Sequence, residues 1–391
     1  MKIAKFEIKK QKKFRIDFLL VFCVLFLVGI GVLMVYSASF YQAELTYHNK
    51  FFFMKKQIIG AFIGFCGMIG LYFFDYEKLK KLKWVSIILS TVLLALVFIP
   101  HVGVKVYGAK RWINLGFFTL QPSEIAKFGF VLFASASLSQ ASRKVKSFRG
   151  ILPTILAGSL MCLLIIMEPN MSITICVGVT MISMLFVGGA SLKHFLLMLV
   201  PLVLLVPVLI IIEPYRLRRL VAFLDPFASA NSEGFQLVQS LYAISSGGLF
   251  GVGLFNSRQK YLFLPFAESD FIFSIVAEEF GFVGSAFIIA IFLIIIIRGI
   301  KISLHAPTRF GTYLASGIVS VIAVQMLVNI AVVSGSIPPT GVPLPFISAG
   351  STSLVVFMSA IGILLNIDKQ SHEQNLSTAK VGEQKLFHFK H

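Results

Sequence analysis

Two groups of charged residues in this sequence have the types and spacing for chemistry, although apolar residues surround both. Glu124 and Lys127 are three positions apart in the segment QPSEIAKFGF, so on a helix they share a face and can pair. One interpretation is a structural ion pair that fixes the helix in a bundle. The other is a cation held ready for a phosphate group, with Glu124 orienting it and the fork-shaped donor Arg111 contacting the same phosphate.

The second group follows a long polar segment. Asp270, Ser274 and Glu278 are four positions apart, which places them on one face of a helix that begins near Asp270. Asp270 is either the N-cap of that helix, which would lower its pKa and weaken it as a base, or a general base at the outer surface of a membrane. One of Glu278 and Glu279 is expected to face the bundle and to bond a loop or a cation there.

Further cations precede this group. The segment EPYRLRRLVAFLDPF carries Arg216 and Arg219. It is either an amphipathic segment that lies against lipid headgroups or a binding site for a pyrophosphate. The Gly-rich turn SSGGLFGVG, further along, allows a close backbone approach to a ligand. It lacks the strand–turn–helix context of a nucleotide-binding loop.

Composition identifies the elements that must position these residues. Of the 391 residues, 57% are hydrophobic and 13% are charged, whereas soluble domains have about 25% charged residues. The expected fold class is therefore all-α, a polytopic membrane protein. The net charge of +18 does not indicate nucleic-acid binding, because the basic residues form short clusters between apolar runs, as in proteins that orient their helices in a bilayer. The four cysteines lie inside apolar runs and have no metal-ligand spacing.

Ten apolar runs approach the length of about 20 residues that a spanning helix needs. They are 17–37, 57–75, 84–100, 122–140, 151–167, 171–188, 195–212, 271–298, 313–335 and 351–367. An even number places both termini on one side, and the Lys and Arg clusters on alternate connections make that side cytoplasmic. We therefore expect a basic cytoplasmic tail over 1–16, a ten-helix domain over 17–367, and a polar cytoplasmic tail over 368–391. A large extracytoplasmic loop over 213–270 would separate the seventh and eighth helices.

The last outer loop, SGSIPPTGVPLPFISAGSTS, has four prolines within eight positions, so it forms no regular helix. Irregular backbone at membrane depth must be buried in protein or line a polar cavity. We therefore expect this loop to fold back into the bundle. Gln325 and Asn329, four apart on the ninth helix, are candidates to bond it; a polar contact between helices is the alternative.

The motifs resemble those of the SEDS family (shape, elongation, division and sporulation), which includes FtsW, RodA and SpoVE. The matching segments extend over nearly the whole chain: RWINLG…QPSEIAK at 111–127, YRLRRLVAFLDP at 215–226, GFQLVQSLYAISSGGLFGVGLFNSRQK at 234–260, AESDFIFSIVAEEFG at 267–281 and PPTGVPLPFISAGSTSL at 338–354. The FNSRQK and ISAGSTS segments are more similar to FtsW and SpoVE than to RodA. This favours a role in division over an elongation-type, RodA-like role.

The resemblance implies a peptidoglycan glycosyltransferase that polymerises lipid II at the outer face of the cytoplasmic (inner) membrane. The essential Asp of the family corresponds to Asp270, the predicted general base. The predicted substrate-binding residues, all in the matching motifs, are Arg111, Glu124, Lys127, Arg216, Arg219, Gln239, Lys260 and Ser348. The resemblance also implies as partners lipid II, a glycan on undecaprenyl pyrophosphate, a class B penicillin-binding protein and other division proteins, with no nucleic acid.

The sequence departs from the family pattern around Asn170, at Phe266 and Glu268, and in the turn at 349–353, so we assign no role to the first three residues. A divalent cation, Mg²⁺ or Mn²⁺, near Asp270 or Glu268 could offset charge on the leaving pyrophosphate, although no spacing demonstrates a metal site. The rival functions are a lipid II flippase and a non-catalytic scaffold. The charged residues gather near the outer surface, whereas an alternating-access site lies near the membrane midplane.

Overall fold

A computed structural model describes residues 16–106, 109–114, 119–141, 145–198, 200 and 214–388. Within these residues the fold is a bundle of long helices: α1 (Phe18–Tyr47), α2 (Phe52–Phe73), α4 (Lys83–Leu96), α5 (Pro122–Ala141), α6 (Phe148–Met167), α7 (Met171–Val187), α11 (Ile272–Leu304), α12 (Arg309–Val333) and α13 (Ser351–His388). Six of the described helices are long and apolar enough to cross a membrane, and α7 is a shorter apolar helix. The chain is thus a multi-pass membrane protein, as the sequence predicts.

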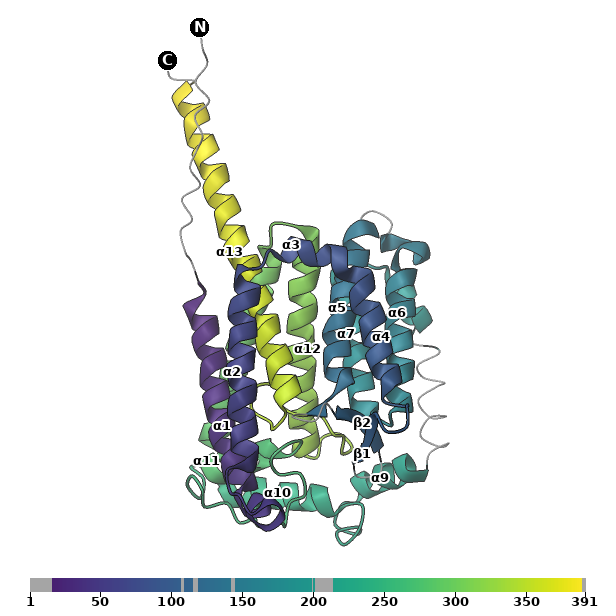
Figure 1. Ribbon diagram of the computed structural model, residues 1–391, viewed down its shortest axis with the longest axis vertical. Helices are drawn as coiled ribbons and strands as arrows, with labels where there is room; N and C mark the ends of the chain where they lie inside the picture. Colours follow the sequence, from purple (N-terminus) through teal and green to yellow (C-terminus); the bar gives the residue numbers. More distant parts are fainter. Residues whose placement is uncertain are drawn as a thin grey trace.

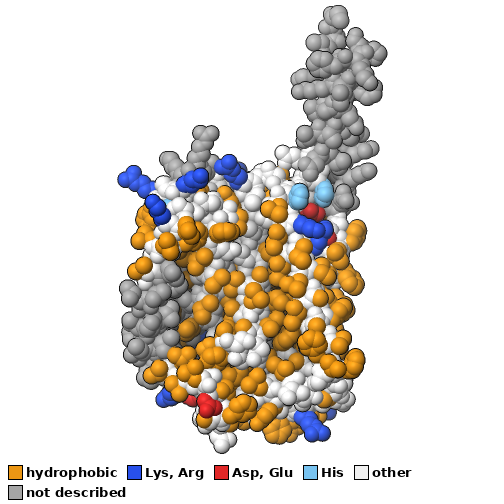
Figure 2. All heavy atoms as spheres, turned by 180° about the vertical axis from the view of Figure 1, so that it is seen from behind, with side chains coloured by type: hydrophobic (Ala, Val, Ile, Leu, Met, Phe, Trp, Pro, Cys, Tyr) orange, Lys and Arg blue, Asp and Glu red, His pale blue; other side chains and the backbone are white. Residues whose placement is uncertain are grey.

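The two ends of the bundle differ. The end of α13 and the short elements α3 (Tyr76–Leu79) and η1 (Lys80–Leu82) lie at one end, and α9 (Pro214–Leu224), α10 (Phe235–Gly247) and a small sheet lie at the other (Figure 1). Between the ends, apolar side chains cover much of the surface (Figure 2), including exposed Phe62 and Phe186. Such a belt is expected of a surface that faces lipid.

Helix boundaries show where hydropathy is a poor guide. The seventh predicted span, 195–212, lies mostly outside the described residues, so the number of membrane crossings remains a prediction. The last predicted span, 351–367, ends with the apolar run, whereas α13 continues to His388 through the segment expected to be a polar tail. Lys, Gln, Glu and Ala are good helix formers, and hydropathy detects only the apolar part of such a helix.

The segment between α4 and α5 forms a small antiparallel sheet that the apolar pattern did not predict. Its strands are β1 (Gly103–Val106), β2 (Ala109–Asn114) and β3 (Thr119–Leu120), in that order. Ile113 pairs with Gly103 on one side and Leu120 on the other, and its side chain is buried. The sheet thereby fixes the position of Arg111, two residues earlier on the same strand.

Helix α11 is broken near its start, where Gly281 has φ 68° and ψ −166°. Segment 248–253 fills the break and exchanges backbone hydrogen bonds with α11 on both sides of it, at 2.9 to 3.1 Å. A Cβ atom on Gly251, whose φ is +81°, would lie 2.1 Å from the carbonyl oxygen of Glu279. In the described structure, the Gly-rich turn therefore uses its close backbone approach to pack against α11.

The proline-rich loop folds back into the bundle, as the sequence predicts. Its apolar residues Val342, Leu344, Phe346 and Ile347 are buried. The amide of Gln325 donates to the Pro343 carbonyl at 2.9 Å. That of Asn329 donates to the Val342 carbonyl at 2.7 Å. The predicted role of these two side chains is confirmed: they bond backbone carbonyls whose loop conformation leaves them without helical partners.

Candidate active site

Asp270 precedes α11 without capping it. The N-cap of α11 is Phe271, which makes no side-chain capping bond, so the N-cap interpretation of Asp270 is wrong. The backbone is held instead by Asn329, whose amide donates to the Asp270 carbonyl at 2.8 Å as well as to the returning loop. Helix α12 therefore fixes the Asp270 backbone and leaves its carboxylate available for other contacts.

Three separate elements bring polar groups to the Asp270 carboxylate. A Cβ atom on Gly341 would lie 2.9 Å from Asp270 Oδ2 and 4.0 Å from Arg111 Nη1, so the loop backbone passes close to both side chains. Arg219 of α9 donates from Nη1 to the Pro339 carbonyl of the same loop at 3.2 Å. The carboxylate of Asp270 and the guanidinium groups of Arg111 and Arg219 therefore all lie against the loop at 336–350.

This environment sets the proton affinity of Asp270. Burial raises the pKa of the Asp270 carboxyl from its ordinary value of 3.8 to about 6; Arg111 and Arg219 act to lower the pKa, while Glu268 and Glu124 act to raise it. The side chain nevertheless keeps partial contact with solvent. A carboxyl that is mostly ionised at neutral pH, yet basic enough to accept a proton, is suited to general-base catalysis.

Glu168, at the end of α6, is a second buried acid that sequence reasoning missed. Arg111 donates from Nε to the Glu168 carbonyl at 3.2 Å and from Nη2 to the Pro169 carbonyl. The Glu168 side chain is fully buried, and neither carboxyl oxygen has a hydrogen-bond partner. Burial raises its pKa to about 8, against the lowering effect of Arg111. The available signal was an acid at the end of an apolar run, where the family pattern is broken.

Glu124 and Lys127 do form the predicted pair, at 2.9 Å, but their side chains are only 0% and 1% exposed. The Lys127 ammonium also donates to Gln325 of α12, and Glu124 accepts from Ser353 of α13 at 2.8 Å. The pair thus joins α5 to two other helices. This geometry favours the structural interpretation, because the Lys127 ammonium already bonds protein oxygens; a phosphate-binding role for Lys127 stays a prediction.

The contacts of Lys260 also favour a structural role, and its predicted role in substrate binding stays a prediction. Its ammonium is buried, 3.1 Å from Glu279 Oε1 and 3.2 Å from the Ser37 hydroxyl of α1. The neighbouring Glu278 accepts hydrogen bonds from Ser257 and from the Arg258 amide. The expectation that one of the two glutamates bonds a loop or a cation is confirmed: Glu278 bonds a loop and Glu279 a cation.

The other predicted substrate-binding residues, Ser348, Gln239 and Arg216, lie on three different elements. The Ser348 hydroxyl accepts from the Leu344 amide at 2.7 Å and donates to the Ser269 carbonyl at 2.6 Å, so it ties the returning loop to the residue before Asp270. Gln239 lies partly buried on α10. Arg216 belongs to α9, but its side chain lies outside the described residues. Binding roles for all three stay predictions.

The carboxyls near Asp270 are the place where a divalent cation would be held. Among the described residues no three His, Cys, Asp or Glu side chains gather into a metal-binding group. Glu268 Oε2 is buried without a hydrogen-bond partner, and Glu268 is near enough to raise the Asp270 pKa. Mg²⁺ in enzymes often uses one or two carboxylates and takes its other ligands from water and substrate phosphates, so Glu268 and Asp270 fit that requirement.

The fold and the site together describe a multi-pass membrane protein with an acid and two guanidinium groups beside a re-entrant loop at one end of its helices. The profile of the FtsW/RodA/SpoVE family of cell cycle proteins matches residues 18–373. This match covers most of the sequence, and the chain belongs to that family.

Similar proteins agree with this assignment. Stage V sporulation protein E of Bacillus subtilis is 41% identical over 363 residues, covering 92% of this chain and 99% of that protein. The probable peptidoglycan glycosyltransferase FtsW of Geobacter metallireducens is 37% identical, covering 93% of this chain and 97% of that protein. A chain from a structure of a peptidoglycan synthase complex that coordinates polymerization and crosslinking superposes with a TM-score of 0.76 at 26% identity, covering 92% of this chain and 99% of that one. RodA of Thermus thermophilus superposes with a TM-score of 0.67 at 25% identity, covering 91% and 97%.

Proposed function

We propose that this chain is a peptidoglycan glycosyltransferase that polymerises lipid II during cell division, with Asp270 as its general base. The single observation that carries the assignment of roles is the position of Asp270. Its carboxylate and the Arg111 guanidinium both lie close to the loop backbone at Gly341, and its pKa is raised to about 6. The division role is supported by relatives named FtsW and Stage V sporulation protein E over nearly the whole chain.

The geometry suits an inverting transfer between two lipid-linked sugars. The acceptor is the 4-hydroxyl of the GlcNAc of an incoming lipid II, and the donor is the anomeric carbon of a glycan on undecaprenyl pyrophosphate. Asp270 takes the hydroxyl proton as the oxygen attacks, the bond from the anomeric carbon to the pyrophosphate breaks, and the α-linked donor becomes a β-1,4 bond. The electron pair of the broken bond leaves with the pyrophosphate.

Arg111 and Arg219 serve the leaving group in this proposal. Guanidinium groups bind phosphate oxygens in a bidentate manner, and charge that develops on the pyrophosphate is stabilised best by donors that are already oriented. Arg111 is oriented by the carbonyls of Glu168 and Pro169 and Arg219 by that of Pro339. A divalent cation held by Glu268 and Asp270 would supply further positive charge to the pyrophosphate.

The site would open outward. The basic segments on alternate connections favour a cytoplasmic position for both termini, and α9 and α10 lie at the opposite end of the bundle (Figure 1). We therefore place the site at the outer face of the cytoplasmic membrane. The segment 1–16 would be a basic cytoplasmic tail, 17–367 the membrane domain with the 213–270 loop outside, and 368–391 a polar cytoplasmic tail. A class B penicillin-binding protein is the proposed partner.

Reconstitution with labelled lipid II tests the proposal against its rivals. Proteoliposomes that hold this protein together with its cognate class B penicillin-binding protein should form polymeric glycan, and the same transpeptidase alone should form none. Translocation of lipid II without polymer would indicate a flippase, and the absence of both activities would indicate a scaffold. The placement of the acid and guanidinium groups at one end of the helices disfavours the flippase, because alternating-access sites lie near the midplane.

A further inference from the structure

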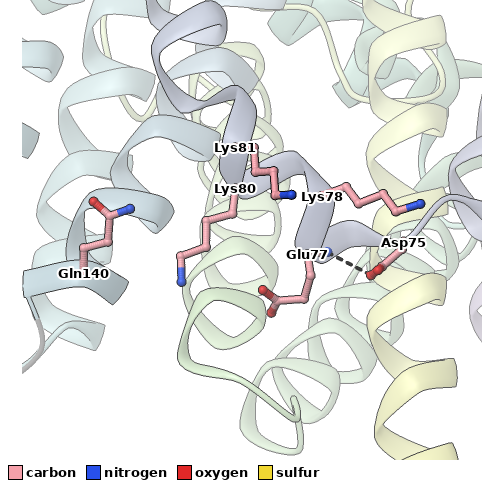
Figure 3. A pocket seen from close by; sticks show the side chains of 6 residues that line it. All are labelled: Asp75, Glu77, Lys78, Lys80, Lys81 and Gln140. Atoms are coloured by element: carbon pink, nitrogen blue, oxygen red, sulfur yellow. Dashed lines mark hydrogen bonds between the residues drawn. The ribbon is translucent and has the colours of Figure 1, made fainter.

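The end of the molecule opposite Asp270 contains a polar hollow of about 550 Å³, lined by Asp75, Glu77, Lys78, Lys80, Lys81 and Gln140. It lies between the short elements α3 and η1 and the end of α5 (Figure 3). Its lining combines three lysines with two acids, so the question is whether the acids neutralise the lysines or are engaged elsewhere.

Both acids are engaged by other groups. Asp75 accepts hydrogen bonds from the Glu77 amide at 3.1 Å and from Gln370 of α13 at 2.9 Å. Glu77 accepts from the Thr308 hydroxyl. Among the described residues, no carboxylate lies within ion-pair distance of Lys78, Lys80 or Lys81. These donors are neutral, so the two carboxylates keep their charge and the lining carries three positive and two negative side chains. Lys78 and Lys80 also lie over the rings of Phe74 and Phe310, at 5.9 and 6.0 Å from the ring centroids. The hollow therefore has a positive excess of one charge, carried by lysines that are not held in ion pairs among the described residues.

The platform under these lysines is rigid. The Tyr76 ring is buried and stacks on Phe310 of α12 at 6.1 Å between centroids. Its hydroxyl is 3.1 Å from Thr308, and its amide donates to Asn366 of α13 at 3.1 Å. The lysine stems thus start from backbone fixed to two long helices, which lowers the entropy lost when the ammonium groups close on a ligand.

The surroundings indicate which anion would enter. Apolar and aromatic side chains flank the lysine segment on both sides, with Phe73 and Phe74 before it and Leu82 and Trp84 after it, between 41% and 58% exposed. Trp concentrates where a membrane meets water, and basic clusters beside membrane helices attract anionic lipids. A phosphate that reaches this hollow from the bilayer would have its acyl chains beside these exposed residues.

We propose that this hollow binds the headgroup of an anionic phospholipid, with Lys78, Lys80 and Lys81 contacting its phosphate. The lipid would pack against α2 and α4, and Gln140 would offer a further hydrogen bond from the α5 side. Neither the membrane topology nor the glycosyltransferase reaction requires this site, so the proposal is independent of the proposed function.

Trp84 provides a local reporter. The sequence has two tryptophans, so a Trp112→Phe background leaves Trp84 as the only one. In phosphatidylcholine vesicles, brominated phosphatidylglycerol should quench Trp84 more strongly than brominated phosphatidylcholine at equal mole fraction. Each lysine near an anionic headgroup contributes roughly a fivefold change in association, about 1 kcal/mol. We therefore expect a several-fold preference for phosphatidylglycerol.

Variants then assign the preference to this hollow. Replacing Lys78, Lys80 and Lys81 by Gln should bring the preference close to one, and replacing them by Arg should retain it. The matched control removes the same charge away from the hollow by replacing Lys146, Lys193 and Lys301 with Gln, and it should behave as the parent does. Equal quenching by both lipids in the parent, or a preference that survives the first triple variant, would overturn the proposal.

Soluble competitors distinguish the sources of the anion. Glycerol 3-phosphate shares the headgroup phosphate without the acyl chains and should leave the quenching unchanged. If it abolishes the preference, the ligand is a free phosphate and the lipid assignment is wrong. If an oligo-glutamate peptide displaces the lipid at a concentration where glycerol 3-phosphate does not, the hollow binds an acidic protein segment instead.

Discussion

Two kinds of buried charge occur in this molecule, and their partners differ. The interior pairs, Glu124–Lys127 and Lys260–Glu279, have side chains that are at most 1% exposed and opposite charges about 3 Å apart. Around Asp270, by contrast, the charges meet across the backbone of the loop at Gly341, and burial raises the Asp270 pKa to about 6. Buried oxygens without hydrogen-bond partners occur at both kinds of site, in Glu268 near Asp270 and in Glu279 of an interior pair, so they do not separate the two.

This difference in partners separates charged groups that stabilise the fold from charged groups that are available for catalysis or binding. A buried charge that is fully paired cannot also bond a substrate without losing its partner, and losing the partner is costly. An acid whose pKa burial raises toward neutrality, as at Asp270, can exchange a proton near neutral pH, and such groups concentrate at functional sites. The comparison therefore assigns chemistry to the Asp270 site and structure to the interior pairs.

The largest expected effect comes from Asp270→Asn. The amide has nearly the same shape but accepts no proton at neutral pH, so polymerisation of lipid II should fall by about 10²- to 10⁴-fold, with unchanged expression and thermal stability. In the parent protein the rate should also fall as pH drops through about 6, because Asp270 is then protonated.

The matched control is Asp225→Asn, an exposed acid after α9 whose side chain accepts a hydrogen bond from the Ala228 amide of its own turn at 3.0 Å. Its polymerisation rate should stay near that of the parent. Full activity of Asp270→Asn would show that Asp270 is not the general base. The contrast between a chemical site at Asp270 and structural interior pairs would then be lost.

The next effect tests an interior pair through Lys127→Met. This change leaves Glu124 buried without its cation, which typically costs about 3–5 kcal/mol, so the yield of folded protein and its unfolding temperature should drop. Adding Glu124→Gln removes the orphan charge and places an amide donor near the Gln325 oxygen that Lys127 bonded. The double variant should recover most of the stability lost by the single one.

Activity per folded molecule decides between the two interpretations of this pair. If the double variant is stable and polymerises lipid II normally, Lys127 is structural. If it is stable but binds substrate many-fold more weakly, the phosphate-binding interpretation that the sequence left open is correct. The burial of Lys127 would then not indicate a purely structural role.

How far the sequence predicts this molecule depends on the kind of interaction. Length and apolarity predict the long helices, and proline spacing predicts the re-entrant loop. The bonds from Gln325 and Asn329 to that loop also follow, because a polar side chain in an apolar helix needs a partner nearby. All three rules follow from the cost of leaving polar groups unbonded in lipid, and each can be applied to a local stretch of sequence.

Tertiary partners are what the sequence does not reveal. Lys260 meets Ser37 across more than two hundred positions of sequence, and no spacing rule connects them. Glu168 gains importance only because β2 delivers Arg111 to its carbonyl, and β2 itself lies in a segment without a clear apolar alternation. Burial, which separates structural from chemical charges here, is a property of the folded contacts.

An intermediate effect is expected from Glu168→Gln. Burial raises the folded-state pKa of Glu168 from 4.5 to about 8, so between those values the folded chain holds a proton that the unfolded chain releases. The wild-type protein therefore loses stability as pH rises through this window, and the neutral amide variant does not.

The variant should accordingly become more stable relative to the parent as pH increases from 5 to 8. The full pKa difference corresponds to roughly 5 kcal/mol, but effective dielectric constants near 20 even at buried sites reduce our expectation to about 1–2 kcal/mol. Unfolding temperatures measured across this pH range test it. A difference that stays constant with pH would show that Glu168 is ionised, and that Arg111 satisfies it as a partner.

The smallest expected effect is the most specific to the Asp270 site. Arg219 acts to lower the Asp270 pKa and Glu268 acts to raise it, so removing each charge should move the acidic limb of the pH–rate profile in opposite directions. Arg219→Gln should shift this limb to higher pH and Glu268→Gln to lower pH, each by a fraction of a pH unit. Neutralising a member of the Lys260–Glu279 pair, which is not among the charges that shift the Asp270 pKa, would change the amount of folded protein and leave the limb where it is. Because opposite shifts cannot arise from a common loss of stability, the two profiles report directly on the field at Asp270. Shifts in the same direction would mean that another group controls the acidic limb.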